Sequence, residues 1–204
     1  HAVTVRAVPA DLTDEDFLDR IRAVADPLDI GLLVNNAGAA LTGAFLAHEL
    51  DDELGLLYLN CRAPLVLSHF YGRRLAERGR GGIINVASAS AFLPMPYWTH
   101  YAATKAFGLH FSEGLAVELA ARNVDVLALC PGGTRTEFSE VAGTLAGGMD
   151  PERVVDAALD TLGQAPVAIP GLRNRMSVLS LRMMPRRTLA RVGAGAVRSR
   201  MGTV

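Results

Sequence analysis

Short apolar runs alternate along this chain with longer segments in which apolar positions recur every three or four residues. The short runs predict buried strands, and the longer segments predict amphipathic helices. Strands are expected at residues 3–8, 31–34, 83–87, 125–130 and 167–169, and helices at 13–24, 51–77, about 101–122 and 151–162. Strands that alternate with helices are typical of an α/β fold, a doubly wound parallel sheet covered by helices on both faces.

Local signals mark where several of these helices begin or break. Asp150 followed by Pro151 predicts a helix start, because a side-chain acceptor caps the first turn and proline suits its first position. Thr13, followed three residues later by an acid, predicts another helix start. Pro64 predicts a break within the longest helix, because proline has no N–H to donate.

The composition is that of an ordinary globular protein. At 204 residues, 50% apolar and 20% charged, the chain is expected to form one domain with a substantial core. No apolar run reaches the roughly 18 residues of a membrane span, and no signal-peptide pattern is visible. Cys61 and Cys130 lack motif spacing, which favours reduced, buried residues of a cytoplasmic protein over a disulfide or a thiol nucleophile.

Charge is distributed unevenly along the chain. Residues 1–160 hold all 21 acidic residues and 12 of the 20 basic ones, whereas residues 161–204 hold eight arginines and no acid. The sequence therefore divides into a main domain, 1–170, and a basic, apolar C-terminal extension, 171–204, which is expected to be helical. The extension is expected to cap the main domain or a subunit contact. A weak contact with an anionic membrane surface or an acidic acyl carrier is the alternative.

Three residues carry candidate chemistry, since Ser88, Tyr101 and Lys105 stand at the spacing Ser-x12-Tyr-x3-Lys. Within a helix Tyr101 and Lys105 are neighbours one turn apart, and an ammonium that close lowers the pKa of a phenol. Ser88 follows a predicted strand, where its hydroxyl can hydrogen-bond the oxygen that the phenol protonates. The set suits general acid–base catalysis on an alcohol or ketone. A surface Tyr–Lys pair is the ordinary alternative, because this spacing also arises by chance.

Four further motifs surround these residues: Leu-Leu-Val-Asn-Asn-Ala-Gly at 32–38, Leu-Asn at 59–60, Ile-Ile-Asn-Val-Ala-Ser at 83–88 and Leu-Ala-Leu-Cys-Pro-Gly at 127–132. In this order and spacing, the chain from about Val3 to Ile169 resembles the short-chain dehydrogenase/reductase family. The resemblance implies a Rossmann-like fold and an NAD(P)-dependent oxidoreductase that interconverts an alcohol and a ketone or aldehyde. A non-catalytic binding or scaffold protein of this family is the alternative. An epimerase or dehydratase ranks last, because only 35 residues follow Ile169.

The resemblance also implies a role for each catalytic candidate. Tyr101 is expected to be the general acid and base, and Lys105 to lower its pKa and to bind the nicotinamide ribose. Ser88 is expected to orient and polarise the carbonyl group. Asn60 corresponds to the family residue that kinks its helix and holds a water connecting Lys105 to solvent. The alternative for Asn60 is a polar helix residue that bonds its own backbone.

The resemblance places the dinucleotide, NADP or NAD, on three further segments. The adenine contact corresponds to Asp11 and Leu12, and the turn under the adenosine ribose corresponds to Asn35, Ala37 and Gly38. The segment over the nicotinamide and pyrophosphate corresponds to Pro131, Gly132, Thr134 and Thr136. An ordinary acidic turn and a tight turn at a strand end are the alternatives for the first two. A Pro-Gly-Leu-Arg-Asn-Arg segment at 170–175 resembles bacterial reductases of the family and favours NADP.

One family element has no counterpart in these 204 residues, the glycine-rich turn Thr-Gly-xxx-Gly-x-Gly that binds the pyrophosphate. Aligned by motif, the chain begins just before the family's third strand, without strands 1 and 2. In the family's strand order this leaves two empty positions between strands 3–8 and 31–34, so about 50–60 preceding residues are expected to be absent. Alternatively, strand 3–8 pairs directly beside strand 31–34.

Substrate and assembly are inferred from the same resemblance. Five apolar residues are expected to form a wall for a hydrophobic or acyl-type carbonyl substrate, beside a lid at 138–148: Phe92, Met95, Trp98, Phe138 and Val141. Core or interface packing is the alternative for these five. The helices at 51–77 and 101–122 are expected to form a dimer contact, which gives a homodimer or homotetramer. No nucleic-acid partner and no metal site are expected, because the five histidines lack metal-ligand spacing.

Overall fold

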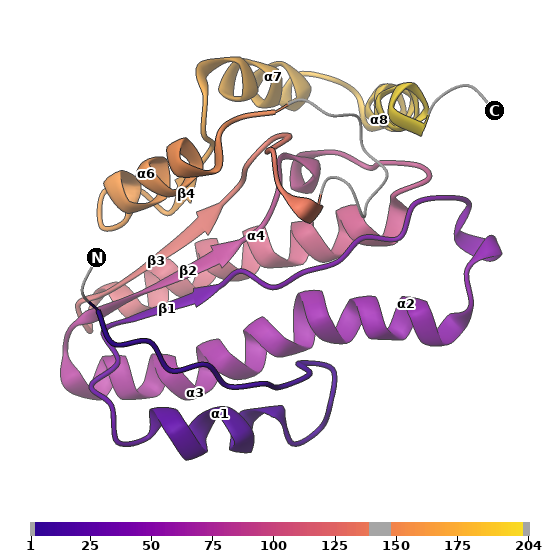
Figure 1. Cartoon of the computed structure of the whole chain (residues 1–204). Helices are drawn as coiled ribbons and strands as arrows, with labels where there is room; N and C mark the ends of the chain where they lie inside the picture. The colour runs from indigo at the N-terminus through magenta and orange to yellow at the C-terminus, as the bar shows by residue number, and fades with distance from the viewer. Residues whose placement is uncertain (1–2, 139–147, 202–204) are drawn as a thin grey trace.

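The computed structural model describes residues 3–138 and 148–201. At its centre lies a parallel sheet of four strands in the order β1-β2-β3-β4 (Figure 1). The strands are β1 Leu32–Asn35, β2 Gly81–Val86, β3 Val124–Leu129 and β4 Val167–Ala168. In the register of the sheet, Val34 of β1 pairs with Ile84 of β2, which pairs with Leu127 of β3. The predicted α/β fold with a parallel sheet is confirmed.

Helices connect the strands and cover the sheet. They are α1 Phe17–Ala25, α2 Leu50–Leu57, α3 Ala63–Arg78, α4 Thr99–Ala120, α6 Pro151–Thr161, α7 Leu172–Arg182 and α8 Arg186–Met201. Short 3-10 turns, Phe45–Ala47 and Ala89–Phe92, lie in the loops after β1 and β2. Within residues 3–138 and 148–201, no helix has the length and apolar character needed to cross a bilayer.

Different helices bury the two faces of the sheet, because alternate residues of a strand point to opposite faces. On one face, Ile83 of β2 packs with Leu75 of α3. On the other face, Ile84 and Leu127 pack with Val154 of α6. Strands β2 and β3 are therefore buried along most of their length, as expected of a parallel sheet between two helical layers.

The predicted break near Pro64 takes the form of one π-helical turn, Tyr58–Arg62, through which α2 continues into α3. Pro64 lies in the first turn of α3, where a missing N–H is tolerated. A single π-helical turn inside an α-helix often occurs at a functional site. Here it carries Asn60, which is buried.

The two helix starts predicted from capping residues have different outcomes. Helix α6 begins as predicted, since the Asp150 carboxylate accepts a hydrogen bond from the backbone N–H of Glu152 at 3.1 Å. The predicted cap at Thr13 is wrong, because α1 begins at Phe17. Thr13 instead donates from its backbone N–H and its hydroxyl to the Asp11 carboxylate, at 2.8 and 2.7 Å.

The predicted strand at residues 3–8 is also wrong, because this segment forms no strand. A strand needs a neighbouring strand to satisfy its backbone groups, and within the described residues β1 pairs with β2 alone. The alternative pairing of residues 3–8 beside β1 is therefore not observed. The side chains along this stretch are open to solvent, with Val5 80% exposed, and Val34 at the free edge of β1 is 50% exposed.

Candidate active site

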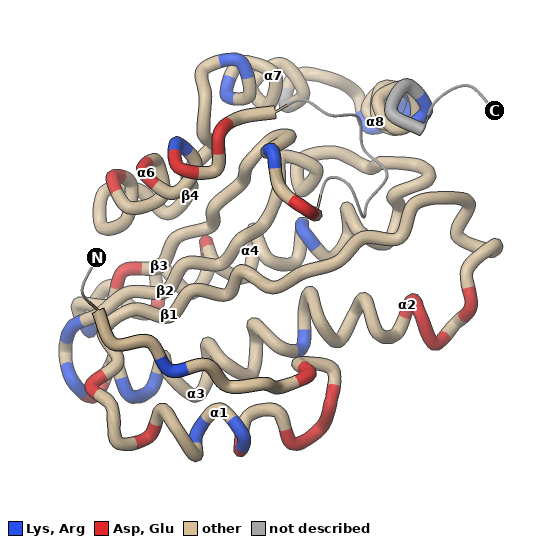
Figure 2. The backbone as a smooth tube through the Cα atoms, viewed as in Figure 1, with Lys and Arg blue, Asp and Glu red and all other residues tan. Residues whose placement is uncertain are grey.

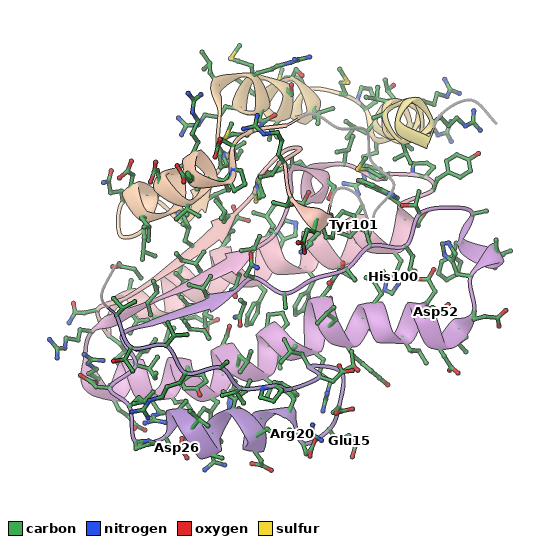
Figure 3. All side chains as sticks on the ribbon, viewed as in Figure 1. Glu15, Arg20, Asp26, Asp52, His100 and Tyr101 are labelled. Carbon is green, nitrogen blue, oxygen red and sulfur yellow. The ribbon has the colours of Figure 1, made fainter. Side chains whose placement is uncertain are left out.

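The candidate site lies at the carboxyl ends of β1, β2 and β3, where the loops that follow parallel strands meet at one edge of the sheet. Gly38 follows β1, Ser88 follows β2 and Pro131 follows β3. Helix α4 begins at the same edge, and Tyr101 and His100 lie together in its first turn (Figure 3). Residues separated by almost 100 positions in the sequence are thus brought to one edge.

Tyr101 is enclosed by apolar side chains, since only 5% of its surface is exposed. Its ring packs edge-on against Trp98, with ring centroids 5.2 Å apart, and lies 6.0 Å from the ring of Phe138. Met95 and Val197, the latter from α8, complete the cluster. The phenol is therefore held in a fixed, largely dry setting, which strengthens its electrostatic interactions.

Lys105 lies one helical turn after Tyr101 and is also buried, at 7% exposure. Its Nζ atom is 5.8 Å from the centre of the Tyr101 ring and donates a hydrogen bond to the Val86 carbonyl at 2.9 Å. Burial lowers the pKa of Lys105 to about 8. The amine thus remains largely protonated at neutral pH, and its charge favours the ionised form of a neighbouring phenol.

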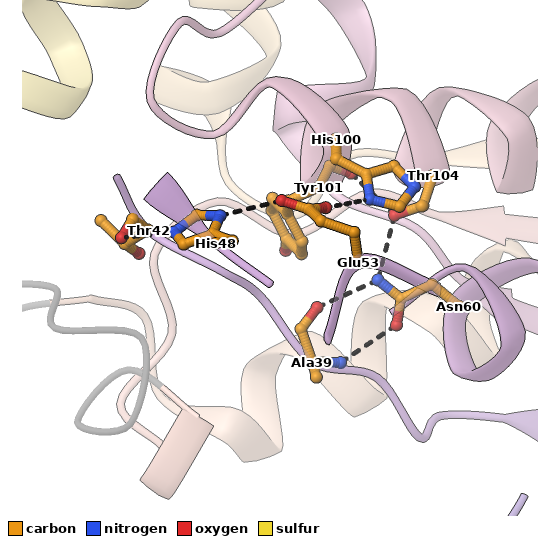
Figure 4. Close-up of polar contacts among 8 residues, drawn as sticks. All are labelled: Ala39, Thr42, His48, Glu53, Asn60, His100, Tyr101 and Thr104. Carbon is orange, nitrogen blue, oxygen red and sulfur yellow. Dashed lines mark hydrogen bonds and ion pairs between the residues drawn. The ribbon is translucent and has the colours of Figure 1, made fainter. Parts of the chain in front are cut away.

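Asn60 joins the loop after β1 to helix α4 (Figure 4). Its side-chain oxygen accepts from the Ala39 N–H, and its amide nitrogen donates to the Ala39 carbonyl and to the Thr104 hydroxyl, each at 3.0 Å. The Thr104 hydroxyl donates in turn to the Tyr101 carbonyl at 2.8 Å. Asn60 therefore bonds other segments of the chain and helps to fix the turn of α4 that carries Tyr101.

Gly38 leaves room for this arrangement. A Cβ atom at this position would lie 3.2 Å both from the Asn60 Oδ1 atom and from the Lys105 Nζ atom. Contacts this short force a neighbour to shift, so a glycine lets the backbone approach both groups. This turn, predicted from the Asn-Asn-Ala-Gly motif, is thus tied to the catalytic candidates in space.

Ser88 caps the 3-10 turn that follows β2. Its Oγ atom accepts from the Ser90 N–H at 3.1 Å, and its side chain is half-buried at the edge of the sheet. A hydroxyl that accepts one hydrogen bond still has its own hydrogen to donate. Ser88 can thus donate to a substrate oxygen while its position is fixed by the backbone.

A second polar group, not found by the sequence reasoning, lies beside Tyr101 (Figure 4). The buried carboxylate of Glu53 contacts the Nδ1 atom of His48 at 2.8 Å and the Nδ1 atom of His100. The other ring nitrogen of His48 lies 3.3 Å from the Thr42 carbonyl. Because both nitrogens of His48 face acceptors, the geometry suits a protonated imidazolium.

The charges of this group agree with its geometry. The hydrogen bond to Glu53 raises the pKa of His48 above its usual value. Burial acts to raise the pKa of Glu53, but the bonds from His48 and His100 outweigh it and hold that pKa below its usual value. Within residues 3–138 and 148–201, no cluster of His, Cys, Asp or Glu is arranged to hold a metal ion. The group therefore ties α2, α4 and the loop after β1 together as an ion pair.

The segments matched to the adenine and the ribose have mixed surroundings. The exposed carboxylate of Asp11 is held by Thr13, whose backbone N–H is the main cause of the lowered pKa of Asp11. Leu12 packs against the apolar cluster of α1 and α3. Asn35 donates within the protein, to the Asn85 side chain at 2.7 Å and to the Ser68 hydroxyl at 3.1 Å. Its side-chain amide therefore supports the sheet.

The loop after β3 is covered by α7. A Cβ atom on Gly132 would lie 2.7 Å from the side chain of Asn174, which donates to the Pro170 carbonyl at 2.8 Å. Thr134 and Met149 form a short parallel bridge farther along the loop, and Thr136 is exposed. The structure thus places α7 directly on the predicted cofactor segment.

Only part of the predicted apolar wall lies around Tyr101. Met95, Trp98 and Phe138 surround Tyr101, whereas Phe92, at the end of the 3-10 turn after β2, packs in a different cluster with Leu109. Val141, with most of the predicted lid, lies outside the described residues. Helix α8 packs on the loop before α4, as expected of an extension that caps the main domain, and its Gly193 approaches the Pro94 carbonyl too closely for any larger residue.

The sequence model of the family described as short chain dehydrogenase matches residues 1–144. The chain belongs to the short-chain dehydrogenase family. It is 32% identical over 168 residues to a very-long-chain 3-oxoacyl-CoA reductase of Anas platyrhynchos, a match that covers 80% of this chain and 54% of the relative. The chain spans about half the length of the first curated relatives that it matches.

Two solved structures share the fold described above. A 7beta-hydroxysteroid dehydrogenase is 28% identical, with a TM-score of 0.83, and the match covers 91% of this chain and 75% of that one. A short-chain dehydrogenase from Sphingobium yanoikuyae in complex with NADPH is 36% identical, with a TM-score of 0.78, and the match covers 87% of this chain and 73% of that one. The resemblance inferred from the motifs is confirmed at the level of the family.

Proposed function

We propose that this short-chain dehydrogenase is a cytoplasmic, nicotinamide-dependent oxidoreductase that interconverts a hydroxyl and a carbonyl group on a hydrophobic substrate. The observation that carries this proposal is the burial of Tyr101 one turn from Lys105, with the Lys105 Nζ atom 5.8 Å from the ring centre. A buried phenol beside a buried cation is suited to transfer a proton, whereas the same pair on a solvent-exposed surface would be a poor proton donor.

In the reducing direction, the Tyr101 hydroxyl donates its proton to the substrate oxygen, and Lys105 stabilises the phenolate that remains. Ser88 donates a hydrogen bond to the same oxygen and so favours the charge that develops on it. Asn60 holds the first turns of α4 through Thr104, which keeps the phenol in place. In the oxidising direction, the same phenolate accepts the proton of the alcohol.

The residues present fit a nicotinamide dinucleotide. The backbone at Gly38 has no Cβ atom to crowd Lys105, and the exposed Asp11 carboxylate accepts both bonds from Thr13 on Oδ1, which leaves its second oxygen for a ligand. Asp11, Leu12, Ala37, Gly38, Pro131, Gly132, Thr134 and Thr136 would hold the dinucleotide, with Tyr101 and Lys105 at its nicotinamide end. The bound cofactor would supply or accept the hydride. We propose NADPH as the dinucleotide, because a related dehydrogenase was solved in complex with NADPH and because the segment at 170–175 resembles that of bacterial reductases of the family.

The substrate proposal rests on the apolar cluster around Tyr101 and on the names of the relatives. Met95, Trp98 and Phe138 pack beside the phenol and give it apolar surroundings. A very-long-chain 3-oxoacyl-CoA reductase and a 7beta-hydroxysteroid dehydrogenase are both similar to this chain. We therefore propose a ketone or secondary alcohol on a long acyl chain or a fused-ring skeleton.

We also propose a homodimer or homotetramer built on α2, α3 and α4. Exposed apolar side chains follow this surface: Leu50, Leu54, Leu57, Leu65 and Val117. A sedimentation-velocity experiment tests this part. A monomer at micromolar concentration would contradict it.

The experiment that tests the function titrates NADPH into the full-length protein while the fluorescence of Trp98, which packs on Tyr101, is followed. Saturable quenching is expected, together with NADPH consumption when a long-chain 3-oxoacyl thioester or a steroid ketone is added. The absence of a saturable signal with both NADPH and NADH would contradict the proposal and favour a non-catalytic scaffold protein.

A further inference from the structure

Helix α7 exposes one continuous apolar face. Leu172, Met176, Leu179 and Met183 follow one another at intervals of four, three and four residues, which places them on the same side of a helix. These four residues, named here the α7 stripe, are 75%, 59%, 58% and 85% exposed. Single exposed apolar residues are ordinary, but a row of four over three helical turns is typical of an interaction surface.

The orientation of the α7 stripe is fixed by contacts on the opposite side of the helix. Val178 is buried, at 4% exposure, and Asn174 lies against Gly132 while its amide bonds the Pro170 carbonyl. The helix cannot bury the stripe by rotating without breaking these contacts. The stripe is therefore an outward-facing surface of the folded chain.

Only positive charges accompany the stripe. Figure 2 shows Lys and Arg but no Asp or Glu along α7 and α8, and the sequence has no acid after Asp160. Arg173 and Arg175 are exposed on α7, and Arg186 and Arg187 are exposed at the start of α8. Arginines beside an exposed apolar row are the pattern of a helix that lies in the interface of an anionic membrane.

We propose that the α7 stripe lies on the surface of an anionic lipid bilayer, with the neighbouring arginines on lipid phosphates and carboxylates. The charge of the surface argues against pairing with a second copy. In a symmetric contact the same patch meets itself, so arginines would face arginines. The exposed apolar residues of α2, α3 and α4 are the ones proposed above for such pairing.

The position of the stripe gives it a function in substrate supply. Helix α7 rests on the loop at Gly132, and α8 packs through Val197 on the cluster that contains Tyr101. A bilayer in contact with α7 would therefore lie on the side of the molecule that covers the site. This part rests on the proposed function, because long-chain and steroid ketones partition into lipid.

Vesicle sedimentation of the full-length protein tests the proposal. Vesicles of phosphatidylcholine alone are compared with vesicles of phosphatidylcholine mixed with phosphatidylserine. Binding to the mixed vesicles is expected, with loss at high salt. The double substitution Met176→Glu with Leu179→Glu is expected to weaken this binding by about tenfold or more, because it removes apolar contacts and repels the anionic surface.

Leu46→Glu is the matched control, because Leu46 is a similarly exposed apolar residue, at 92% exposure, in a different loop. This variant is expected to bind like the unchanged protein. Circular dichroism and turnover of a water-soluble ketone report whether each variant is folded. Equal binding of the double variant and the unchanged protein would overturn the proposal, as would the absence of binding to both kinds of vesicle.

A complex with a purified acidic acyl carrier protein in place of vesicle binding would also overturn the proposal. The test of membrane binding can fail or succeed independently of the proposed function, since Tyr101→Phe should lose turnover and still bind the mixed vesicles. A protein that binds vesicles but not NADPH would keep the membrane surface and lose the enzyme.

Discussion

The residues matched to proton transfer and those matched to the dinucleotide lie in contrasting surroundings. Asn60, Tyr101 and Lys105 are each at least 93% buried and are joined by contacts within the chain. Asp11 and Thr136, in contrast, are exposed on loops. The first set is positioned by a helix, a strand end and a π-helical turn before any ligand arrives. We therefore expect substitutions to separate chemistry from cofactor binding.

The largest separation is expected for Tyr101→Phe. The ring and its packing remain, but the proton donor is lost, so turnover should fall by about a thousandfold. The NADPH dissociation constant should change by no more than about twofold. Steady-state kinetics and fluorescence titration measure the two effects. Tyr58→Phe, at a 40% exposed tyrosine of the π-helical turn, is the matched control, and retention of most activity by Tyr101→Phe would exclude the phenol as the donor.

The next largest effect is expected for Gly38→Ala. Its Cβ atom would lie 3.2 Å from both the Lys105 Nζ and the Asn60 Oδ1 atoms, so it should disturb both groups at once. We expect kcat/KM to fall by about tenfold, a loss of about 1.4 kcal/mol of transition-state stabilisation. Gly114→Ala is the control, because its Cβ would meet nothing within 4 Å. It should stabilise α4 slightly, and an equal fall in both variants would refute the crowding argument.

A smaller, indirect effect is expected for Glu53→Gln. The substitution leaves the shape intact but removes the charge that pairs with His48 and His100, which should cost about 1–3 kcal/mol of unfolding free energy. We expect a smaller fall in kcat/KM than the roughly tenfold fall expected for Gly38→Ala, because Tyr101 itself is untouched. Denaturant unfolding and kinetics measure this. Unchanged stability would show that the ion pair does not hold the loop.

The pH dependence of stability identifies His48 in this group. Its pKa is raised in the folded state, so its contribution is fully present below its unfolded pKa, about 6.5, and is lost as pH rises through the folded value. The pKa of Glu53 is lowered, so its contribution is lost as pH falls below its usual range. Glu53→Gln should therefore flatten the decline in melting temperature on the alkaline side, relative to the unchanged protein. A decline of the same size in both would assign it to another group.

The smallest effect is expected on the cofactor side. Asp11→Asn keeps the hydrogen bonds from Thr13 but removes the charge of an exposed acceptor. NADPH affinity should weaken a few-fold, while kcat at saturating NADPH stays unchanged. Asp19→Asn, at an exposed acid of α1, is the control. A larger effect on kcat than on affinity would show that the two sets of residues are not separable.

The sequence predicted the parts of this structure that depend on local signals. Strands β2 and β3 follow from continuous apolar runs, and the start of α6 follows from Asp150 and Pro151. The family motifs identified Asn60, whose contacts with Ala39 and Thr104 could not be read from one helix. Predictions that ignored neighbouring segments failed, as at residues 3–8, where strand formation depends on a paired strand.

The Glu53 group could not be predicted for a related reason. Asp51, Asp52 and Glu53 look alike in the sequence, as acids in the first turn of a helix. Only the folded chain buries Glu53 and brings His48 and His100 to it. The proximity of His100 to Tyr101 in the sequence was the one available signal. It does not show which way the imidazole points.

The pH dependence of kcat/KM for alcohol oxidation, measured for the unchanged protein and for Lys105→Met, tests the central claim most directly. Methionine fills a similar volume without a charge, so the phenol keeps its packing and loses the cation. The acidic limb of the profile is expected to move to higher pH by about one unit or more in Lys105→Met, because the ionised phenol is no longer stabilised. A profile with the same limb in both proteins would contradict it.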